Sequence, residues 1–367
     1  MNIPALVQAQ KNHFADQQTK NISERKQLLK RLLTVVLEKE KQIVDALYLD
    51  FKKSEYESVM TETSIVISEL KRTIKNINYW AKPQHVTPAL LNFPSSSKIY
   101  KEPYGAVLII APWNYPYQLA LVPLIGAIAA GNTVILKPSE LTPNTSKITK
   151  EIIELVFDKN LVAVVEGGVE VSTELLAERW DYIFFTGSVQ VGKIVAKAAA
   201  AFLTPVTLEL GGKNPCIIDE TANIKLAAKR IVWGKFINGG QTCIAPDYLL
   251  IHKSVKDNFV SCFKSEIEIA YGKNPEDSKD YPRIVNKRNF DRLASMLENE
   301  TFLVGGKTNR EDNYIAPTLI DEPSLDSEVM KGEIFGPISP VISYETEKDL
   351  ENIIHKYEKP LALYVFS

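Results

Sequence analysis

The polar segment NGGQTC at residues 238–243 ends in a cysteine whose neighbours suit nucleophilic chemistry. It lies between an apolar run with helical spacing, residues 227–237, and a strand-like run, residues 248–251. Glycine has no Cβ, so a glycine pair near a thiol leaves room for a flat carbonyl carbon to approach. Thiols kept for packing are the commoner kind in proteins. From this segment alone, a nucleophile and a buried, inert thiol are equally good interpretations of Cys243.

Two polar motifs follow apolar, strand-like runs in the first half of the chain. Asn114 lies in the proline-bounded turn PWNYP after the run at residues 107–110. A fixed amide there can stabilise a developing oxyanion. Lys137 and Glu140 follow the run at residues 133–136, at the strand end where α/β sheets bind ligands, and a carboxylate there can accept hydrogen bonds from ribose hydroxyls. Taken singly, each motif is also compatible with a structural turn or a polar loop.

Three further motifs combine glycine, carboxylate and aromatic residues. The segment GSVQVG at 187–192 follows the run 182–185 and opens a helix, whose N-terminus can bind an anion. With only two glycines, a tight strand-to-helix turn is the favoured interpretation of this segment alone. Glu209 follows a strand and has the chemistry of a general base, although a solvated glutamate is commoner. Glu333 and Phe335 can hold a ribose and wall a ring, or form a polar turn with one apolar anchor.

The elements that position these motifs have the pattern of an α/β protein. Helical periodicity covers residues 28–47 and about 55–80, and apolar strands then alternate with helices at 119–130, 146–157 and 191–201. That alternation favours a parallel sheet covered on both faces. A second series starts near residue 215, and its strands are expected at residues 216–218, 248–251, 302–304, 315–320 and 340–342. The segment 83–103 is rich in proline and serine and is predicted to be a linker, an extended arm or a surface loop.

Composition limits the classes of function. A length of 367 residues predicts two or more domains, and a net charge of -2 argues against a nucleic-acid or anionic-membrane partner. No apolar stretch is long enough for a transmembrane segment. The three cysteines are widely spaced without a CxxC pair, so we expect no metal site and no disulfide framework, and a reducing, cytoplasmic location. The histidines form no convincing pair with a cysteine or serine, which disfavours a hydrolase.

In combination and in chain order, the motifs resemble those of aldehyde dehydrogenases. The resemblance covers the chain from its N-terminal helices to its last residue, and the compact N-terminus is similar to the class 3 branch of fatty and aromatic aldehyde dehydrogenases. It rests on these segments: PWN at 112–114, KPSE at 137–140, FTGS at 185–188, ELGGK at 209–213, GQTC at 240–243 and EIFGP at 333–337.

The resemblance implies an α/β fold of two doubly wound, Rossmann-type parallel-sheet domains and a β-arm for oligomerisation. Residues 1–82 and 104–209 would form the dinucleotide-binding domain, residues 83–103 the arm, and residues 210–367 the catalytic domain. Members of the family continue past the strand at 361–366, so we expect a C-terminally truncated chain with an incomplete catalytic domain. A homodimer is the expected assembly.

The resemblance also implies the chemistry, which is oxidation of an apolar aldehyde, fatty or aromatic, to the carboxylic acid with NAD or NADP. Cys243 would form a thiohemiacetal and then a thioester, with the oxyanion held by the Asn114 amide and the Cys243 backbone N–H. Glu209 would activate the hydrolytic water. The cofactor would be bound by Trp113, Lys137, Glu140, Gly187, Ser188, Gly192, Glu333 and Phe335.

Two alternatives stay open at this stage. One is a truncated, catalytically impaired fragment that retains dinucleotide binding. The other is a semialdehyde dehydrogenase that transfers the acyl group to a thiol or phosphate, which Glu209 disfavours because a base there favours hydrolysis. The choice between NAD and NADP is also open, although the Glu140 carboxylate would repel a 2′-phosphate.

Overall fold

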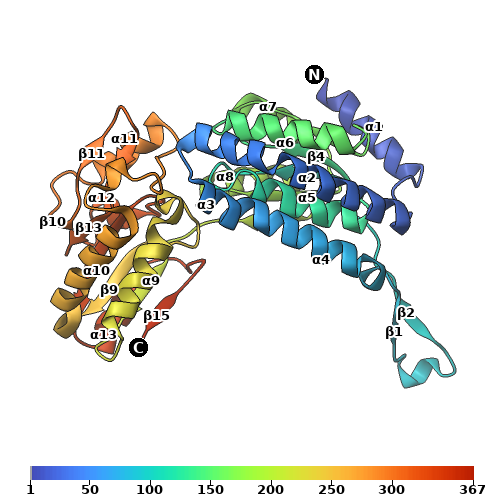
Figure 1. The fold of residues 1–367 in the computed structure, drawn as a ribbon. Helices are drawn as coiled ribbons and strands as arrows, with labels where there is room; N and C mark the ends of the chain where they lie inside the picture. The colour runs from blue at the N-terminus through green and yellow to red at the C-terminus, as the bar shows by residue number, and fades with distance from the viewer. Residues whose placement is uncertain (1) are drawn as a thin grey trace. The chain divides into compact units, whose positions relative to one another are not determined.

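The computed structural model describes residues 2–367 as two compact units, which are coloured by chain position in Figure 1. Unit 1 runs to Ala46, resumes at Val59 and ends at Glu209. Unit 2 comprises Leu47–Ser58 and Leu210–Ser367. The short segment 47–58 therefore belongs with the second half of the chain, whereas the sequence-based division placed it with the first domain.

Unit 1 contains a parallel five-stranded sheet in the order β5-β4-β3-β6-β7. Every residue of β3 and β4 is buried, as expected for central strands covered on both faces. Helices α1 and α5 pack on β3 and β4, α6 packs on β5, and α8 packs on β6 and β7. The predicted α/β architecture is confirmed for this unit. Its elements are α1 (Ile3–Ala15), α2 (Ile22–Phe51, continuing into unit 2), η1 (Val59–Thr63), α4 (Ser64–Trp80), β1 (Gln84–Val86), η2 (Leu90–Asn92), β2 (Ser97–Ile99), β3 (Ala106–Ile110), α5 (Gln118–Ala130), β4 (Thr133–Lys137), α6 (Pro143–Val156), β5 (Val162–Val164), α7 (Val169–Ala177), β6 (Tyr182–Thr186), α8 (Val189–Ala200) and β7 (Val206–Glu209).

Two predictions for unit 1 need correction. The helix expected over residues 55–80 is interrupted, because η1 is a π-helical turn that separates α3 (Glu55–Ser58) from α4. Helix α7 was not predicted at all. The segment 83–103 forms an antiparallel hairpin of β1 and β2, which projects beyond α4 in Figure 1, so the extended-arm interpretation holds.

Unit 2 contains a six-stranded sheet in the order β10-β13-β14-β9-β8-β15. The strands from β13 to β15 are parallel, but β10 is antiparallel to β13, so the sheet is mixed at that edge. The strand expected at 315–320 is two strands, because Pro317 lies between β12 and β13 and has no N–H for the ladder. The elements of unit 2 are α3, β8 (Pro215–Ile218), α9 (Ile224–Phe236), η3 (Ile237–Gly240), β9 (Tyr248–His252), η4 (Lys253–Val255), α10 (Lys256–Tyr271), η5 (Pro275–Asp277), α11 (Lys287–Ser295), β10 (Phe302–Val304), β11 (Thr308–Asn309), β12 (Tyr314–Ile315), β13 (Thr318–Asp321), α12 (Glu328–Lys331), β14 (Ile338–Tyr344), α13 (Glu347–Ile354) and β15 (Tyr364–Phe366).

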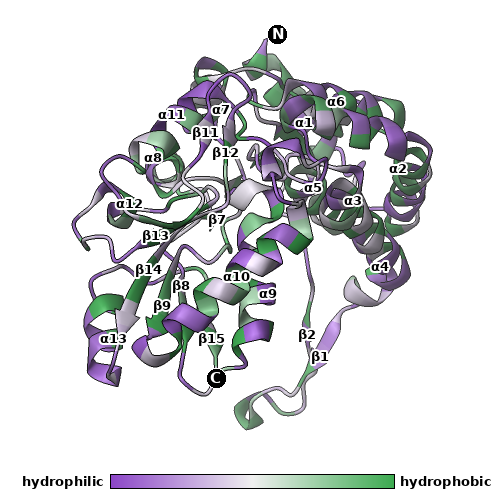
Figure 2. Cartoon of the chain, turned by 60° about the vertical axis from the view of Figure 1, so that its left-hand side comes forward, coloured by the Kyte–Doolittle hydropathy of each residue, from purple (hydrophilic) through white to green (hydrophobic). Residues whose placement is uncertain are grey.

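The unit 2 sheet separates two apolar cores. Leu249 and Ile251 of β9 belong to one core, with Phe259 and Phe263 of α10, whereas Leu250 belongs to the other core. This alternation is the period of a strand with both faces buried. In Figure 2, β8 and β9 are largely hydrophobic, while helices α10 and α13 carry both hydrophilic and hydrophobic residues.

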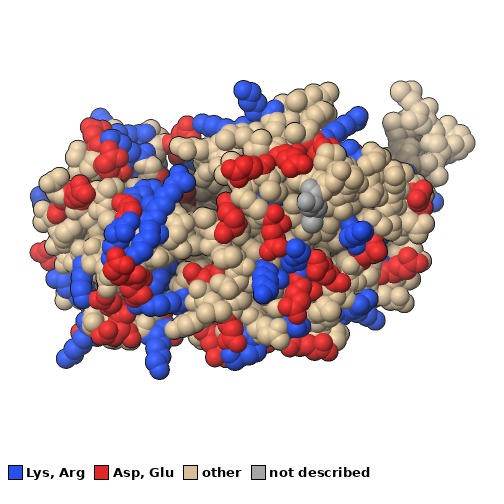
Figure 3. Space-filling view, turned by 90° about the horizontal axis from the view of Figure 1, so that it is seen from above, with Lys and Arg blue, Asp and Glu red and all other residues tan. Residues whose placement is uncertain are grey.

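The molecular surface carries both signs of charge. On the face shown in Figure 3, acidic and basic side chains are interspersed. Within residues 2–367, no helix combines the length and apolar composition needed to cross a membrane. The described residues also contain no group of three or more histidine, cysteine and acidic side chains arranged to hold a metal ion.

Candidate active site

In unit 1, four of the predicted site residues lie at one edge of the sheet. Asn114 follows β3, Lys137 ends β4, Gly187 follows β6, and Glu209 ends β7. These strands are parallel, so their carboxyl ends meet at the same edge. The Gly187 N–H donates to the Glu209 carbonyl over 2.9 Å, which joins two of the four positions directly. We call these residues the carboxyl-edge cluster.

The turn that carries Asn114 is fixed by a carboxylate. Glu62, in the π-helical turn η1, accepts hydrogen bonds from Tyr117 N at 3.1 Å and Gln118 N at 2.8 Å. These two amides lie at the N-terminus of α5, where backbone N–H groups lack helical partners and the helix dipole favours a negative charge. Glu62 therefore anchors the chain just after Asn114, which is itself buried.

Lys137 and Glu140 form an ion pair with Nζ and Oε2 2.6 Å apart. Lys137 is buried, whereas 41% of the Glu140 side chain is exposed, so the carboxylate faces solvent and is open to a ligand. These two residues, both predicted to bind the cofactor, are thus adjacent.

Ser188 caps the N-terminus of α8. Its hydroxyl oxygen accepts from Val191 N over 3.3 Å, and its backbone is extended, as is typical of a helix N-cap. Gly192 is buried in the helix that follows. The strand, turn and helix predicted around residues 187–192 are present, with the helix beginning at Val189.

In unit 2, Cys243 ends a tightly turned segment, residues 238–243, which we call the cysteine loop. Its first three residues all have left-handed φ angles, 57° at Asn238, 63° at Gly239 and 73° at Gly240. At Gly240 a Cβ would lie 2.3 Å from the Gly336 carbonyl oxygen. Glycine is required there both for its φ and for this approach. The contact places the cysteine loop against the segment that carries Glu333 and Phe335.

Gln241 fills the inside of the cysteine loop. Its side-chain amide donates to Asn238 O at 2.9 Å and Arg283 O at 3.1 Å, and its Oε1 accepts from Val285 N at 3.0 Å. The Asn238 side chain in turn donates to Gln241 O over 3.1 Å. Both side chains are buried, so these bonds replace water as the partners of the loop backbone.

Asn214 holds the peptide groups beside Cys243. Its Nδ2 donates to Cys243 O at 2.7 Å and to Ala245 O at 3.0 Å, and its Oδ1 accepts from Ala362 N at 2.9 Å. The Cys243 thiol is partly buried. The other two cysteines differ from it. Cys216 is a core residue and burial raises the pKa of its thiol well above the ordinary range, and Cys262 lies on α10.

The Glu333 carboxylate lies against the glycine turn after β7. A Cβ at Gly211 would be 2.3 Å from both of its oxygens. Burial raises the pKa of Glu333 to about 7, with Asp247 adding to the rise, while the Gly212 N–H, Lys235 and Arg292 oppose it. Its Oε1 is buried and makes no hydrogen bond within the protein. A carboxylate oxygen in that position is ready to accept from a ligand hydroxyl.

A buried ion pair supports the Glu333 segment. Lys213 Nζ contacts Asp247 Oδ2 and donates to Val329 O at 2.9 Å and Gly332 O at 2.8 Å. Asp247 Oδ1 accepts from Ile334 N at 2.9 Å. Asn214 and Asp247 directly precede the parallel strands β8 and β9, at the amino ends of the sheet. We call Asn214, Lys213 and Asp247 the amino-edge network.

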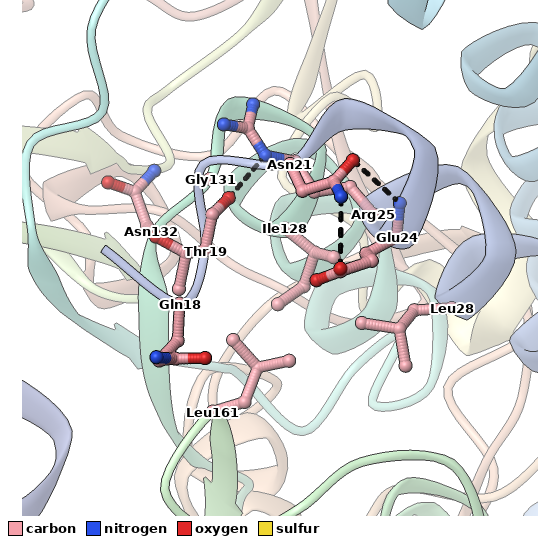
Figure 4. Close-up of a pocket in the computed structure, with 10 residues that line it drawn as sticks. All are labelled: Gln18, Thr19, Asn21, Glu24, Arg25, Leu28, Ile128, Gly131, Asn132 and Leu161. Atoms are coloured by element: carbon pink, nitrogen blue, oxygen red, sulfur yellow. Dashed lines mark hydrogen bonds between the residues drawn. The ribbon is translucent and has the colours of Figure 1, made fainter. Parts of the chain in front are cut away.

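A small cavity lies at the opposite, amino end of the unit 1 sheet (Figure 4). Its volume is about 30 Å³, enough for one or two water molecules. Arg25 lines it and donates to the carbonyls of Thr19 and Lys20 and to Ala129 and Ala130 at the end of α5. The cavity lies between α2 and α5, and it is too small for an aldehyde or a dinucleotide.

Sequence reasoning missed the residues that hold the site. Glu62 and Asp247 were not singled out, because a lone acidic residue has no local signature when its partners are backbone amides far along the chain. Asn214 directly follows the ELGGK motif at 209–213, and its position before a strand is the one signal that could have drawn attention to it.

The comparisons with known proteins agree with this arrangement. Residues 1–367 match the aldehyde dehydrogenase family. The chain is 49% identical over 359 residues to 4,4'-diaponeurosporen-aldehyde dehydrogenase of Staphylococcus aureus, covering 97% of this chain and 78% of that protein. It is 42% identical over 366 residues to the dimeric, NADP-preferring aldehyde dehydrogenase of Rattus norvegicus, covering 100% and 81%. The solved structure of the substrate-bound state of Staphylococcus aureus AldH has a TM-score of 0.98 at 48% identity, covering 100% and 81%. The chain therefore belongs to the aldehyde dehydrogenase family.

Proposed function

We propose that this enzyme oxidises an apolar aldehyde, fatty or aromatic, to the carboxylic acid through a thioester on Cys243. The observation that best supports this proposal is the structure of the cysteine loop. Its left-handed backbone and buried hydrogen bonds hold a partly buried thiol beside the Glu333 segment. A loop built in this way supports a nucleophile better than a packing residue, because left-handed non-glycine residues such as Asn238 are concentrated at functional sites.

The first step is addition of the Cys243 thiolate to the aldehyde carbonyl carbon. The new C–S bond forms as the carbonyl π electrons move to oxygen, which gives a thiohemiacetal oxyanion. The Asn114 side-chain amide and the Cys243 backbone N–H donate to this oxygen. Preorganised donors of this kind contribute several kcal/mol to catalysis. The rigid mounting of Asn114 by Glu62, and of the Cys243 peptide by Asn214, supports that assignment.

The last step is hydrolysis of the thioester. Glu209 takes a proton from water as the water oxygen attacks the acyl carbon, and the C–S bond breaks to release the acid and regenerate the thiolate. The Glu209 side chain is exposed at the end of β7, so it is accessible to water. A base at this position favours water over a thiol or phosphate as the acyl acceptor.

As a member of this family the enzyme uses NAD or NADP. The residues fit such a group, because the Glu333 Oε1 lacks a protein partner and the Glu140 carboxylate is exposed beside Lys137. Glu333 and Phe335 would bind the nicotinamide ribose, and Lys137 with Glu140 the adenine ribose. Gly187 and the capped helix of Ser188 would bind the pyrophosphate, with Gly192 and Trp113 nearby. When bound, the cofactor supplies the two-electron acceptor that the oxidation needs.

The substrate class rests on the named relatives. The name of the staphylococcal relative gives 4,4'-diaponeurosporen-aldehyde as its substrate, and the name of the rat relative describes a dimer. We assign this chain an apolar aldehyde and a homodimer, with the exposed Leu90, Leu91 and Phe93 of the arm available to a second copy. A cytoplasmic location suits a thiol that must stay reduced.

The test is NADH or NADPH formation with medium-chain and aromatic aldehydes, using Cys243→Ala beside the matched control Cys262→Ala. We expect wild-type turnover in the control and a loss of roughly 10³-fold or more in Cys243→Ala. Equal activity in both variants would refute the assignment of the nucleophile. A chain that binds the cofactor but turns over no aldehyde would support the binding-only alternative. In single turnover, Glu209→Gln should accumulate the acyl-enzyme.

A further inference from the structure

The cysteine loop begins at a residue whose backbone is both left-handed and buried. Helix α9 ends at Phe236, and Asn238 then adopts a φ of 57°, a value that residues with a Cβ seldom adopt and that asparagine adopts more readily than most. The residue is 0% exposed, so its backbone N–H is shielded from water. A buried backbone donor outside the helix ladder needs an acceptor from elsewhere in the protein.

That acceptor is Glu57, from a segment 181 residues earlier in the sequence. Its Oε2 accepts from Asn238 N over 3.0 Å. Glu57 lies on the short helix α3, whose start is fixed by Ser54: the Ser54 hydroxyl accepts from Glu57 N at 3.3 Å, and Ser54 O accepts from Ser58 N at 2.8 Å. The segment 47–58 is thus part of unit 2, and it places the Glu57 carboxylate against the first residue of the cysteine loop.

The Glu57 side chain is buried, with charged and phenolic groups near it. Burial raises the pKa of its carboxyl to about 7, and Asp280 adds to the rise, while Lys53 and the Asn238 N–H oppose it. Lys53 is fully buried. Tyr271 of α10 and Tyr281 also lie within electrostatic reach, because Glu57 contributes to the raised pKa values of both phenols. Arg283 acts on Tyr281 in the opposite direction.

The hydrogen bond at Asn238 reaches Cys243 through the loop itself. Asn238 is bonded to Gln241 in both directions, through its carbonyl and its side-chain amide. Gln241 is anchored to Arg283 O and Val285 N, and Cys243 is two residues further on. A change at the first residue of this closed ring of hydrogen bonds therefore changes the backbone from which the thiol projects.

We propose that Glu57 is a positioning residue for Cys243, whose carboxylate holds the Asn238 amide and so fixes the left-handed run that presents the thiol. The effect on thiol reactivity stands by itself, and its catalytic consequence rests on the function proposed above. An ionised carboxylate is a stronger acceptor than a neutral carboxyl group or an amide. Positioning is therefore strongest when Glu57 is ionised and weakens as the pH falls through about 7.

The test measures alkylation of Cys243 by iodoacetamide in the full chain between pH 5.5 and 9, with the Cys243 peptide followed by mass spectrometry. Glu57→Gln keeps an acceptor of the same shape but removes the titration. The ratio of the wild-type rate to the Glu57→Gln rate should be near one at pH 5.5 and rise to roughly tenfold at pH 9. Glu57→Ala should be slower than Glu57→Gln at every pH. The matched control is Glu266→Gln, a buried carboxylate of α10, which should follow the wild type.

A ratio that stays at one across this pH range would overturn the proposal. A ratio below one at high pH would also overturn it, because Glu57 would then act by repelling the thiolate. Glu57→Gln removes a negative charge that acts on the buried Lys53. If this single variant unfolds, the double variant Lys53→Met/Glu57→Gln removes both charges, and the same rate ratio is expected for it. Alkylation needs neither aldehyde nor cofactor. A dehydrogenase assay in which Cys243→Ala stays active would therefore refute the proposed function and leave this result intact.

Discussion

The polar residues of the candidate site lie at the carboxyl ends of the strands in unit 1 and before the amino ends of the strands in unit 2. In unit 1, Asn114, Lys137 and Glu209 come at or after the carboxyl ends of parallel strands. In unit 2, Cys243 and Glu333 come before strands β9 and β14, and Asn214 directly precedes β8. The first arrangement follows the general rule for ligand sites of α/β sheets, and the second departs from it.

The two arrangements are supported by different forces. At a carboxyl edge, the ends of parallel strands bring residues together, and the N-termini of the following helices supply donors. The loops of unit 2 depend instead on buried side chains, of which the amino-edge network and Gln241 are the main ones. Buried polar networks are costly when one member is removed. We therefore expect unit 2 to be the more sensitive half to single polar substitutions.

The largest expected difference between the two units comes from removing the carboxylate of one lysine–carboxylate ion pair in each unit. Asp247→Ala leaves Lys213 buried without its counter-ion and Ile334 N without an acceptor, so we expect a loss of about 3–5 kcal/mol in the free energy of unfolding. Glu140→Ala should cost less, about 1 kcal/mol, because 41% of the Glu140 side chain is exposed and water screens its pair with the buried Lys137. Urea denaturation followed by probes in each unit measures both, and similar losses would remove the distinction.

Glu333 gives a pH-dependent version of the same test. Burial raises its pKa from 4.5 to about 7 in the folded protein, so the folded state holds this proton more tightly than the unfolded state. Stability from this group is thus present below pH 4.5 and is lost as the pH rises towards 7. Between pH 5 and pH 8 the wild type should lose roughly 2.5 kcal/mol more than Glu333→Gln. Parallel stability curves for the two proteins would show that Glu333 is not the group responsible.

The sequence was informative where short-range pattern decides structure. Apolar runs followed by polar residues located β3, β4, β6 and β7 and their carboxyl-edge residues, because strand and site are adjacent in the chain. Pro317, which splits a predicted strand, and the antiparallel β10 depend on pairing that no local window contains. Glu57, Glu62 and Asp247 act on backbone amides between 55 and 181 residues away. Such partners become visible only when the chain is folded.

A third prediction compares two residues that anchor a loop. Asn214→Ala removes the donor to Cys243 O and Ala245 O and leaves Ala362 N without its acceptor, and should cost about 2 kcal/mol. It should also slow aldehyde turnover roughly tenfold or more. Glu62→Gln retains one acceptor for the α5 amides and should cost about 1 kcal/mol. Thermal unfolding measures the loss of stability in each variant, and kcat measures the effect on turnover. An Asn214→Ala enzyme with unchanged kcat would show that the Cys243 peptide does not need the hydrogen bonds from Asn214.

The smallest effect distinguishes a helix cap that serves a ligand from one that serves only the fold. Ser188 caps α8 and Asn223 caps α9, through bonds of 3.3 Å from Val191 N and 3.1 Å from Leu226 N. Replacing either residue by alanine should cost about 1 kcal/mol of stability. Only Ser188→Ala should also weaken binding of NAD or NADP, by a few-fold, because the α8 N-terminus is the one we assign to the pyrophosphate. Fluorescence titration with the cofactor measures this difference. Equal affinity in the two variants would mean that the cofactor does not use the α8 cap, and that its binding depends on the other assigned residues, such as Lys137 and Glu140.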